Sequence, residues 1–261
     1  LESLDEAYNS IKGIPELTER VIKALGVKYL LVVPGDSSTS NLVLAEMGRS
    51  AAEILKKKLE GRDIVGVTGG STMAVVADVV TSEKRYPDVT IIPARGGLGT
   101  DIYTQSNSIA AKLGQALGAK YRLLYLPDSM GEDAIRLALG NEEIKEILKM
   151  IDDMRVLLFG IGRADTMARR RTLPESKFDD LMRNNAVAEA FGHYFDISGR
   201  DLWEYKTVGL SLETYLKVPE VIGVAGGTEK AEAIIAVSSI RKDMTLVIDE
   251  AVANRILEIK N

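Results

Sequence analysis

The sequence predicts an α/β protein: a mostly parallel β-sheet with helices on both faces, together with a small inserted β-containing subdomain. Short apolar runs rich in β-branched residues recur along the chain, and each is followed by a stretch with helical spacing of its apolar residues. The runs are apolar throughout rather than alternating, which is typical of strands buried on both faces. One aromatic-rich segment breaks the pattern and supplies the insertion.

The predicted strands share a short apolar run that ends in a turn or in glycine. They lie within residues 28–36, 63–70, 88–97, 120–127, 154–162, 219–227 and 244–250. The predicted helices alternate with them and lie within residues 40–61, 71–80, 104–118, 132–140, 141–151, 163–171, 228–240 and 251–260. Strands that alternate with helices in this way form βαβ units, and the strands of such units are parallel.

Two segments lie outside this alternation. Residues 1–25 are predicted to form an N-terminal helical linker that is amphipathic and interrupted near Gly13 and Pro15, and residues 26–261 form the main domain. Residues 186–210 hold much of the aromatic content and contain a turn at 198–201. We predict that they form a hairpin-like insertion into the main domain.

Composition excludes several classes of function. The 261 residues include no cysteine and a single histidine, His193, which argues against thiolate or histidine-rich metal sites and against a cysteine nucleophile. No apolar run approaches the roughly 20 residues that span a bilayer. A net charge of −5 argues against a broad nucleic-acid surface, so an anion site has to be local. We expect a cytoplasmic protein with no metal site and no bound cofactor.

Glycines follow four of the predicted strands and give the strongest indication of a binding site. They are Gly69 with Gly70, Gly96 with Gly97, Gly160 with Gly162, and Gly226 with Gly227. The ends of parallel strands meet at one edge of the sheet, where open α/β sheets bind ligands. Ser71 and Thr72 then begin a helix, so hydroxyls and free amide groups point at the same place and suit a phosphate. The alternative is that the hydroxyls only cap the helix and the glycines only turn the chain.

None of these junctions matches a nucleotide-binding motif. Residues 68–72 lack the lysine-containing pattern of a Walker loop. Residues 160–165 start like a dinucleotide fingerprint but have Asp165 where the third glycine belongs, and residues 96–99 are equally incomplete. The sequence therefore disfavours a nucleotide cofactor.

Cationic side chains stand close to the same junctions. Arg95 directly precedes one glycine pair, and Lys230 lies in the first turn of the helix that follows another, where a cation is unfavourable unless an anion compensates it. Glu229 is such an anion in the simplest interpretation. Residues 169–171 are three arginines at a predicted helix C-terminus, and they either form a solvated end or send one guanidinium back to a bound phosphate.

Catalytic arrangements are weak in this sequence. A Ser-His-Asp triad would have to use His193, which we expect to pack or cap within its aromatic-rich stretch, and no G-x-S-x-G elbow is present. Asp249 and Glu250 follow a predicted strand and are either helix caps or partners for sugar hydroxyls. Glu189 is open to the same two interpretations. Sugar-phosphate isomerisation needs a carboxylate base beside a phosphate anchor, so it stays as an alternative hypothesis.

Several motifs together resemble a known family. Residues 35–38, 67–72, 92–101, 121–127, 160–171, 186–195 and 224–234 read GDSS, VTGGST, IPARGGLGTD, YRLLYLP, GIGRADTMARRR, AVAEAFGHYF and VAGGTEKAEAI. In this order they resemble the effector-binding domain of the SorC/DeoR-type bacterial repressors, over nearly the whole chain beyond about residue 25. The resemblance implies a Rossmann-like fold similar to the sugar-phosphate isomerase, deaminase and CoA-transferase group. It also implies a phosphorylated sugar as the effector, with fructose-1,6-bisphosphate as the first candidate.

The resemblance implies where the effector binds. One phosphate is expected on the loop 69–72 with Arg170 nearby, the second between Arg95, Gln105 and Lys230, and the sugar hydroxyls beside Glu189. The complete set of expected effector-binding residues is Gly69, Gly70, Ser71, Thr72, Arg95, Gly96, Gly97, Gln105, Arg170, Glu189, Gly226 and Lys230.

The first hypothesis is therefore a non-catalytic sensor and oligomerisation domain of a repressor of glycolytic genes, present as a homodimer or tetramer. Repressors of this type carry an N-terminal winged-helix DNA-binding domain that is absent from this sequence, which begins with Leu1 rather than Met. Operator DNA would be bound only through that domain, and no membrane is involved. A sugar-phosphate isomerase or deaminase is the second hypothesis, and a nucleotide-binding module is the third.

Overall fold

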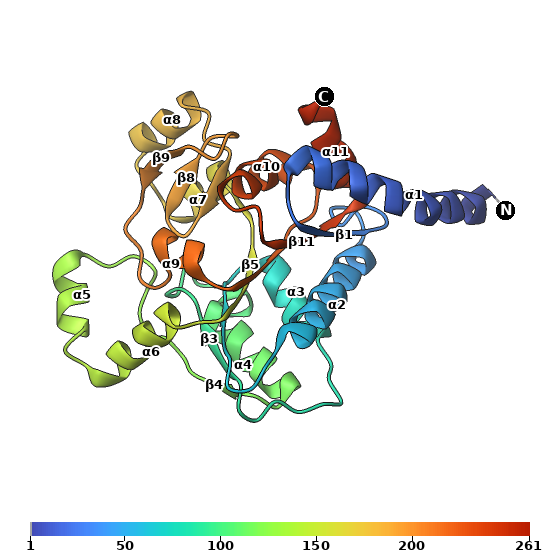
Figure 1. Cartoon of the computed structure of the whole chain (residues 1–261). Helices are drawn as coiled ribbons and strands as arrows, with labels where there is room; N and C mark the ends of the chain where they lie inside the picture. The colour runs from blue at the N-terminus through green and yellow to red at the C-terminus, as the bar shows by residue number, and fades with distance from the viewer. Residues whose placement is uncertain (1) are drawn as a thin grey trace.

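Seven parallel strands form the main sheet of the computed structural model, which describes residues 2–261 apart from the side chains of residues 2–12 and Glu132. The strands are β1 (Tyr29–Val33), β2 (Ile64–Val67), β3 (Thr90–Pro93), β4 (Lys120–Tyr121), β5 (Val156–Gly160), β10 (Glu220–Val224) and β11 (Thr245–Asp249). They lie side by side in the order β1-β11-β10-β5-β2-β3-β4. Figure 1 labels β1, β11, β5, β3 and β4 of this sheet. The predicted α/β fold class with a mostly parallel sheet is confirmed.

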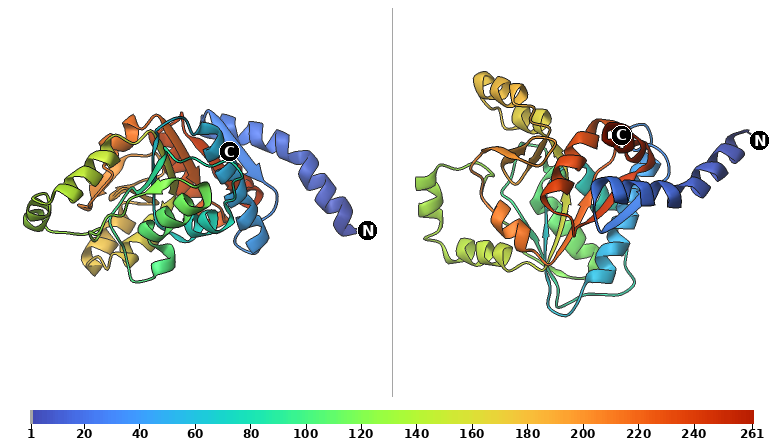
Figure 2. Two further views of the ribbon diagram at one scale, coloured as in Figure 1. Left: turned by 90° about the horizontal axis from the view of Figure 1, so that it is seen from below. Right: turned by 45° about the horizontal axis from the view of Figure 1, so that its top comes forward.

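Helices cover both faces of this sheet (Figure 2). One face carries α2 (Asn41–Lys58), α3 (Ser71–Val79) and α4 (Ser106–Leu117). The other carries α1 (Glu2–Leu25), α6 (Glu142–Asp152), α9 (Leu212–Lys217), α10 (Ala231–Ile240) and α11 (Glu250–Lys260). The central strand β5 shows why both faces are covered: Val156 and Leu158 pack under the first group, and Leu157 and Phe159 pack under the second. A strand that is apolar at every position has to be buried on both sides.

The order of the strands creates one position where the direction of the chain reverses. From β2 the chain proceeds outward through β3 to the edge strand β4, and it then returns to β5, which pairs with β2. From β5 it proceeds the opposite way through β10 and β11. Crossovers that leave in opposite directions open a crevice at the carboxyl ends of the two strands. The loops after β2 and β5 therefore define the place where a ligand can enter.

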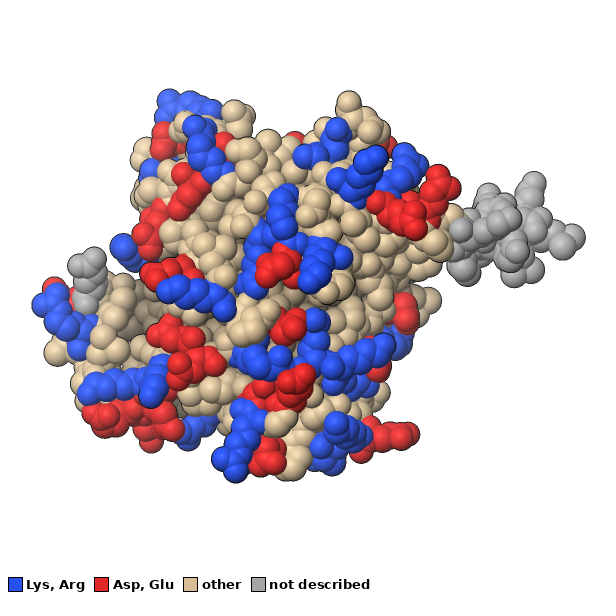
Figure 3. All heavy atoms as spheres, viewed as in Figure 1, with Lys and Arg blue, Asp and Glu red and all other residues tan. Residues whose placement is uncertain are grey.

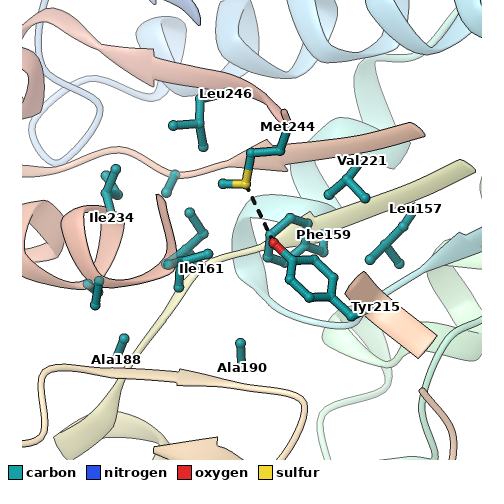
Figure 4. Packing of buried hydrophobic residues seen from close by; sticks show 14 of the residues in the cluster. Leu157, Phe159, Ile161, Ala188, Ala190, Tyr215, Val221, Ile234, Met244 and Leu246 are labelled. Carbon is teal, nitrogen blue, oxygen red and sulfur yellow. Dashed lines mark hydrogen bonds between the residues drawn. The ribbon is translucent and has the colours of Figure 1, made fainter. Parts of the chain in front are cut away.

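A second, antiparallel sheet lies beside this crevice, in the order β6 (Gly162–Arg163), β7 (Ala188–Ala190), β8 (His193–Phe195) and β9 (Asp201–Glu204). Its last three strands fall within the predicted insertion, whereas β6 follows β5 directly. Two helices, α7 (Ala164–Arg170) and α8 (Glu175–Arg183), complete this unit. Figure 4 shows Ala188 and Ala190 of β7 pointing to the same core as Ile161 and Phe159, so the small sheet is packed against the end of β5.

Two predicted elements differ in the structure. The segment 120–127 pairs as a strand only over β4, because the Asn107 side chain accepts from the Leu124 N–H (2.9 Å) and donates to the Leu124 carbonyl (3.0 Å). The interruption expected near Gly13 and Pro15 is also wrong, since α1 continues through both. Proline removes a helical hydrogen bond, but the buried residues Leu17 and Val21 hold the second half of α1 on the core.

A buried carboxylate ties together three loops at the carboxyl ends of β1, β10 and β11. Asp249 is fully buried and accepts hydrogen bonds from the amides of Ser37 (3.0 Å), Gly227 (2.8 Å) and Val252 (2.8 Å). It also accepts from the Ser37 hydroxyl. Asp249 is therefore the N-cap of α11 and the anchor of the turn η2 (Thr228–Lys230), which places Lys230.

The surface seen in Figure 3 mixes basic and acidic side chains, and no large area of one sign is visible on that face. In the part of the chain that the structure describes, no helix has both the length and the apolar character needed to cross a lipid bilayer.

Replacing Asp249 with alanine should lower the free energy of unfolding by about 2–4 kcal/mol, because several buried amides lose a charged acceptor at once. Urea unfolding followed by circular dichroism measures this change. Glu258→Ala is the matched control, since Glu258 pairs with Arg255 on the surface (2.8 Å) and should change stability by less than about 0.5 kcal/mol. Equal effects of the two substitutions would contradict the anchoring role of Asp249.

Candidate functional site

A cavity of about 320 Å³ lies at the reversal point of the sheet. Its walls come from the loops that follow β2, β3, β5 and β10, together with α7 and β7. The residues expected from the sequence that line it are Gly69, Gly70, Ser71, Thr72, Arg95, Gly96, Gln105, Arg170, Glu189 and Lys230. Two expected residues, Gly97 and Gly226, do not line it.

The N-terminus of α3 forms one end of the cavity. Gly70 has φ 117°, which favours glycine, and its N–H donates to the Thr104 carbonyl (2.9 Å). A Cβ on Gly69 would come within 2.7 Å of the same carbonyl, so only glycine allows the two loops to approach this closely. The first amides of α3 have no acceptor within the helix and begin at the cavity wall beside Ser71 and Thr72. This end can bind an anion.

Arg170 lies at the same end. It is the last residue of α7, lines the cavity and donates to the Thr104 hydroxyl (3.2 Å). Because the Thr104 carbonyl also binds Gly70, the guanidinium is held next to the α3 N-terminus. The loop 69–72 and Arg170, expected on either side of one phosphate, therefore lie together.

Lys230 also lines the cavity, on the turn after β10, a strand that lies on the other side of β5 from β2. Among the side chains that the structure describes, none forms a hydrogen bond or an ion pair with it. Burial lowers the pKa of Lys230, the positive charge of Arg163 lowers it further, and Glu229 and Asp249 compensate only in part. An anionic ligand beside this partly desolvated ammonium would stabilise its positive charge.

Arg95 and Gln105, expected to act with Lys230, are engaged with protein groups. Arg95 donates to both oxygens of Asp128 (2.8–3.1 Å) and to Glu189 (3.2 Å). The Gln105 amide accepts from the Leu98 N–H (3.2 Å) and donates to the carbonyls of residues 98 and 99 (2.9 and 3.0 Å), which closes that loop. Of these three residues, Lys230 alone has no partner among the described side chains.

The three consecutive arginines separate into three environments. Arg169 lies over the Phe178 ring, 4.7 Å from its centroid, and Arg170 reaches the cavity. Arg171 is buried and pairs with Asp128 (3.3 Å) and Glu189 (3.0 Å). One arginine of the run, Arg170, therefore lines the cavity, and its contact with a phosphate stays a prediction.

Gly97 and Gly226 serve packing instead. The Gly97 N–H donates to the Leu126 carbonyl (2.9 Å), and its own carbonyl accepts from the Asp128 N–H (2.7 Å). A side chain at Gly226 would overlap Ser37 and Asp249. These glycines allow close backbone approach behind the cavity rather than contact with a ligand.

The cavity contains residues that the sequence did not single out. Asp128 and Arg163 line it, and both follow a predicted strand directly, which is the signal that could have identified them. Arg163 forms an ion pair with Asp165 (2.7 Å). Phe191 also lines the cavity and has φ 56°, a strained conformation for a side chain of this size. Nothing in the sequence pattern predicted that strain.

The remaining candidate groups lie away from the cavity. His193 pairs with Asp201 through Nδ1 (2.6 Å) on the small sheet, and Glu250 accepts from the Gly35 N–H (2.9 Å). Asp249 caps α11, which agrees with the capping interpretation, whereas Glu250 binds a loop amide and caps no helix through this contact. Within the described part of the chain, no three His, Asp or Glu residues are arranged to hold a metal ion.

Comparison with known proteins identifies the class. Residues 9–258 match the family model described as "Putative sugar-binding domain", and the chain belongs to this family. It is a sugar-binding domain of the type found in bacterial transcriptional regulators, and the SorC/DeoR-type resemblance is confirmed.

Individual similar proteins narrow the type of regulator further. The central glycolytic genes regulators of Priestia megaterium and Bacillus subtilis are 38% and 37% identical to the chain, over 98% of its length and 75% and 76% of theirs. A SorC family transcriptional regulator from Enterococcus faecalis superposes with a TM-score of 0.86 at 35% identity, covering 93% of this chain and 99% of that one. The full-length sorbitol operon regulator SorC from Klebsiella pneumoniae has a TM-score of 0.82 at 21% identity, covering 94% and 81%, which shows the common fold.

Replacing Lys230 with methionine should stabilise the ligand-free protein by about 1 kcal/mol at pH 7, because it removes a desolvated charge. The native state binds the Lys230 proton less tightly than the unfolded state does, since its pKa is lowered on folding. The wild type therefore gains stability as the pH rises toward the ordinary lysine value, and the gap to the variant narrows. Urea unfolding at pH 7 and at pH 9.5 measures both effects; a less stable variant would contradict them.

Proposed function

We propose that this chain binds a sugar bisphosphate, with fructose-1,6-bisphosphate as its preferred effector. The main support is the pair of anion-binding ends of the cavity: the α3 N-terminus with Arg170, and Lys230. They follow β2 and β10, and β5 lies between these strands. The strands β2 and β10 themselves are two strand spacings apart, about 10 Å, which is compatible with phosphates at opposite ends of a six-carbon sugar.

The groups between the two ends suit the sugar itself. Asp128 and Glu189 line the cavity and offer carboxylate oxygens to hydroxyl groups. Phe159 and Phe191 line it as well and give an apolar surface for the carbon side of a sugar. Two charged ends with hydroxyl acceptors between them discriminate against monophosphates, because a ligand with one phosphate leaves one end unpaired.

The same geometry supports binding without catalysis. Burial alone would raise the pKa of Glu189, but Arg95, Arg171 and the Gly192 amide outweigh it and hold this pKa below its ordinary value. A carboxylate that acts as a general base needs a pKa near the working pH. The pKa of Glu189 is shifted in the opposite direction. We therefore keep an isomerase or deaminase activity as the second hypothesis.

The two similar proteins from Priestia megaterium and Bacillus subtilis are named as regulators, which supports a regulatory role in the cytoplasm. We propose that the chain acts as a homodimer or tetramer within a repressor of glycolytic genes. The bisphosphate favours one arrangement of the subunits, and operator DNA, bound through a separate N-terminal domain, favours the other. A coupling free energy of about 1–3 kcal/mol between the two ligands weakens operator binding measurably.

Thermal unfolding with a panel of ligands tests the proposal. Fructose-1,6-bisphosphate should raise the melting temperature more than fructose-6-phosphate, glucose-6-phosphate or inorganic phosphate, and each sugar should be recovered unchanged. Turnover of any sugar phosphate would favour the enzyme hypothesis. Protection by NAD or ATP but by no sugar phosphate would favour a nucleotide-binding module.

Lys230→Ala and Arg170→Ala should each remove most of the preference for bisphosphate over monophosphate. One charge-assisted contact contributes about 1.5–3 kcal/mol, so the affinity for the bisphosphate should fall about 10- to 100-fold. Isothermal titration calorimetry measures the affinities. Arg169→Ala is the matched control from the same arginine run, and it should bind as the wild type does. Retention of the full preference in both variants would show that the phosphates bind elsewhere.

A further inference from the structure

Two arginines and two carboxylates form a closed cluster in the wall of the cavity, where Arg95, Asp128 and Glu189 line it. Asp128 and Glu189 are each paired with both Arg95 and Arg171 at distances of 2.8–3.3 Å. The Arg171, Asp128 and Glu189 side chains are only 1%, 2% and 4% exposed, and that of Arg95 is 11% exposed. The cluster is electrically neutral when all four groups are ionised.

The two arginines of the cluster are not equivalent. Arg95 lines the cavity, whereas Arg171 does not. Arg171 is also held from behind, because it donates to the Tyr194 hydroxyl (3.4 Å) and its guanidinium lies 5.4 Å from the centroid of the Tyr205 ring. Burial would lower the pKa of Arg171, but the negative charges of Glu189 and Asp128 raise it, so the residue stays charged.

We infer that Arg171 is a positioning residue that lets Arg95 change partners: it keeps Asp128 and Glu189 paired while a ligand phosphate draws Arg95 into the cavity. This inference rests on the proposed function. It assigns a role to a residue that does not line the ligand space and therefore cannot act by touching the ligand.

The charges show why a second arginine is needed. If Arg95 alone neutralised the two carboxylates, its transfer to a phosphate would leave two buried negative charges without a cation, which is strongly unfavourable. With Arg171 in place, Glu189 keeps a guanidinium at 3.0 Å and the Gly192 N–H at 2.7 Å, and Asp128 keeps a guanidinium at 3.3 Å. The exchange of Arg95 between protein and ligand then leaves no carboxylate unpaired.

The exchange also reaches beyond the cavity. The Asp128 backbone is hydrogen-bonded to two other loops: its carbonyl accepts from the Val208 N–H (2.9 Å), and its N–H donates to the Gly97 carbonyl (2.7 Å). The segment that contains Asp128 continues into α5 (Glu132–Ala138). Glu189 belongs to β7 of the small sheet. Arg95 therefore links the main sheet to both parts in the ligand-free protein. Its transfer to a phosphate leaves the Asp128 loop and the small sheet joined to each other through Arg171.

Proton uptake on ligand binding distinguishes this role from simple stabilisation of the fold. In Arg171→Met, recruitment of Arg95 by fructose-1,6-bisphosphate leaves Glu189 with the Gly192 amide, Tyr194 and the negative Asp128 around it, so Glu189 should take up a proton. Between pH 7 and pH 8.5, the affinity should fall by up to about tenfold per pH unit relative to the wild type. Calorimetry in two buffers of different ionisation enthalpy should find about one proton taken up by the variant and almost none by the wild type.

Arg169→Met is the control from the same run, and it should behave as the wild type. Arg171→Lys, which keeps the charge with a shorter reach, should take up a smaller fraction of a proton and serves where Arg171→Met does not fold by circular dichroism. A crystal structure of the wild type with the bisphosphate should show Arg95 on a phosphate and Arg171 still within 3.0 to 3.3 Å of the two carboxylates.

The outcomes separate the two levels of the proposal. If the wild type binds no sugar phosphate, the proposed function is wrong. If the wild type binds the bisphosphate but the Arg171 variants bind it without added proton uptake, the exchange is wrong and the proposed function stands. A ligand-bound structure in which Arg95 still holds Asp128 through both Nε and Nη2 would overturn the exchange as well.

Discussion

The pairing of β5 with both β2 and β10 is the constraint on which the site depends. It places strands that are distant in the sequence next to each other and makes their following loops converge. Arg170, Lys230 and the α3 N-terminus come from three separate βα units, and no local segment could bring them together. β5 is apolar on both faces, and in its central position helices cover both Leu157 and Leu158.

Electrostatics then decides how an acidic protein can hold an anion. The net charge is −5, so the positive field of the cavity cannot come from the molecule as a whole. It comes from a helix terminus, from Arg170, which donates to the Thr104 hydroxyl, and from the desolvated Lys230, which has no hydrogen-bond or ion-pair partner among the described side chains. The nearby carboxylates do not cancel this field, because Asp128 and Glu189 are each paired with the guanidiniums of Arg95 and Arg171.

The sequence was most informative where local chemistry and position along a strand carry the signal. Gly69 and Gly70, with Ser71 and Thr72, could be placed at a strand end and a helix start from neighbouring residues alone, and the parallel fold class followed from the apolar runs. Arg171 could not be found in this way, since its role arises from contacts with Asp128, 43 positions away in the sequence, and with Glu189. Asp128 directly follows a predicted strand, but its pairing with both arginines is not visible in the sequence. Gly97 and Gly226 show the opposite error. Their positions at strand ends predicted contact with a ligand, but in the structure they allow close backbone packing and do not line the cavity. The continuation of α1 through Pro15 likewise depends on packing against the core that no local pattern encodes.

The small antiparallel sheet has a consequence for spectroscopy. The single tryptophan of the chain, Trp203, lies on β9 with its ring 5.6 Å from that of Tyr194, and the Lys177 ammonium lies 4.6 Å from the Trp203 ring. The hydroxyl of Tyr194 is a partner of Arg171. Emission excited selectively from the indole therefore originates one aromatic ring away from the buried charges, with no contribution from other residues of these 261. The protein carries a built-in optical reporter of that region, and it needs no label.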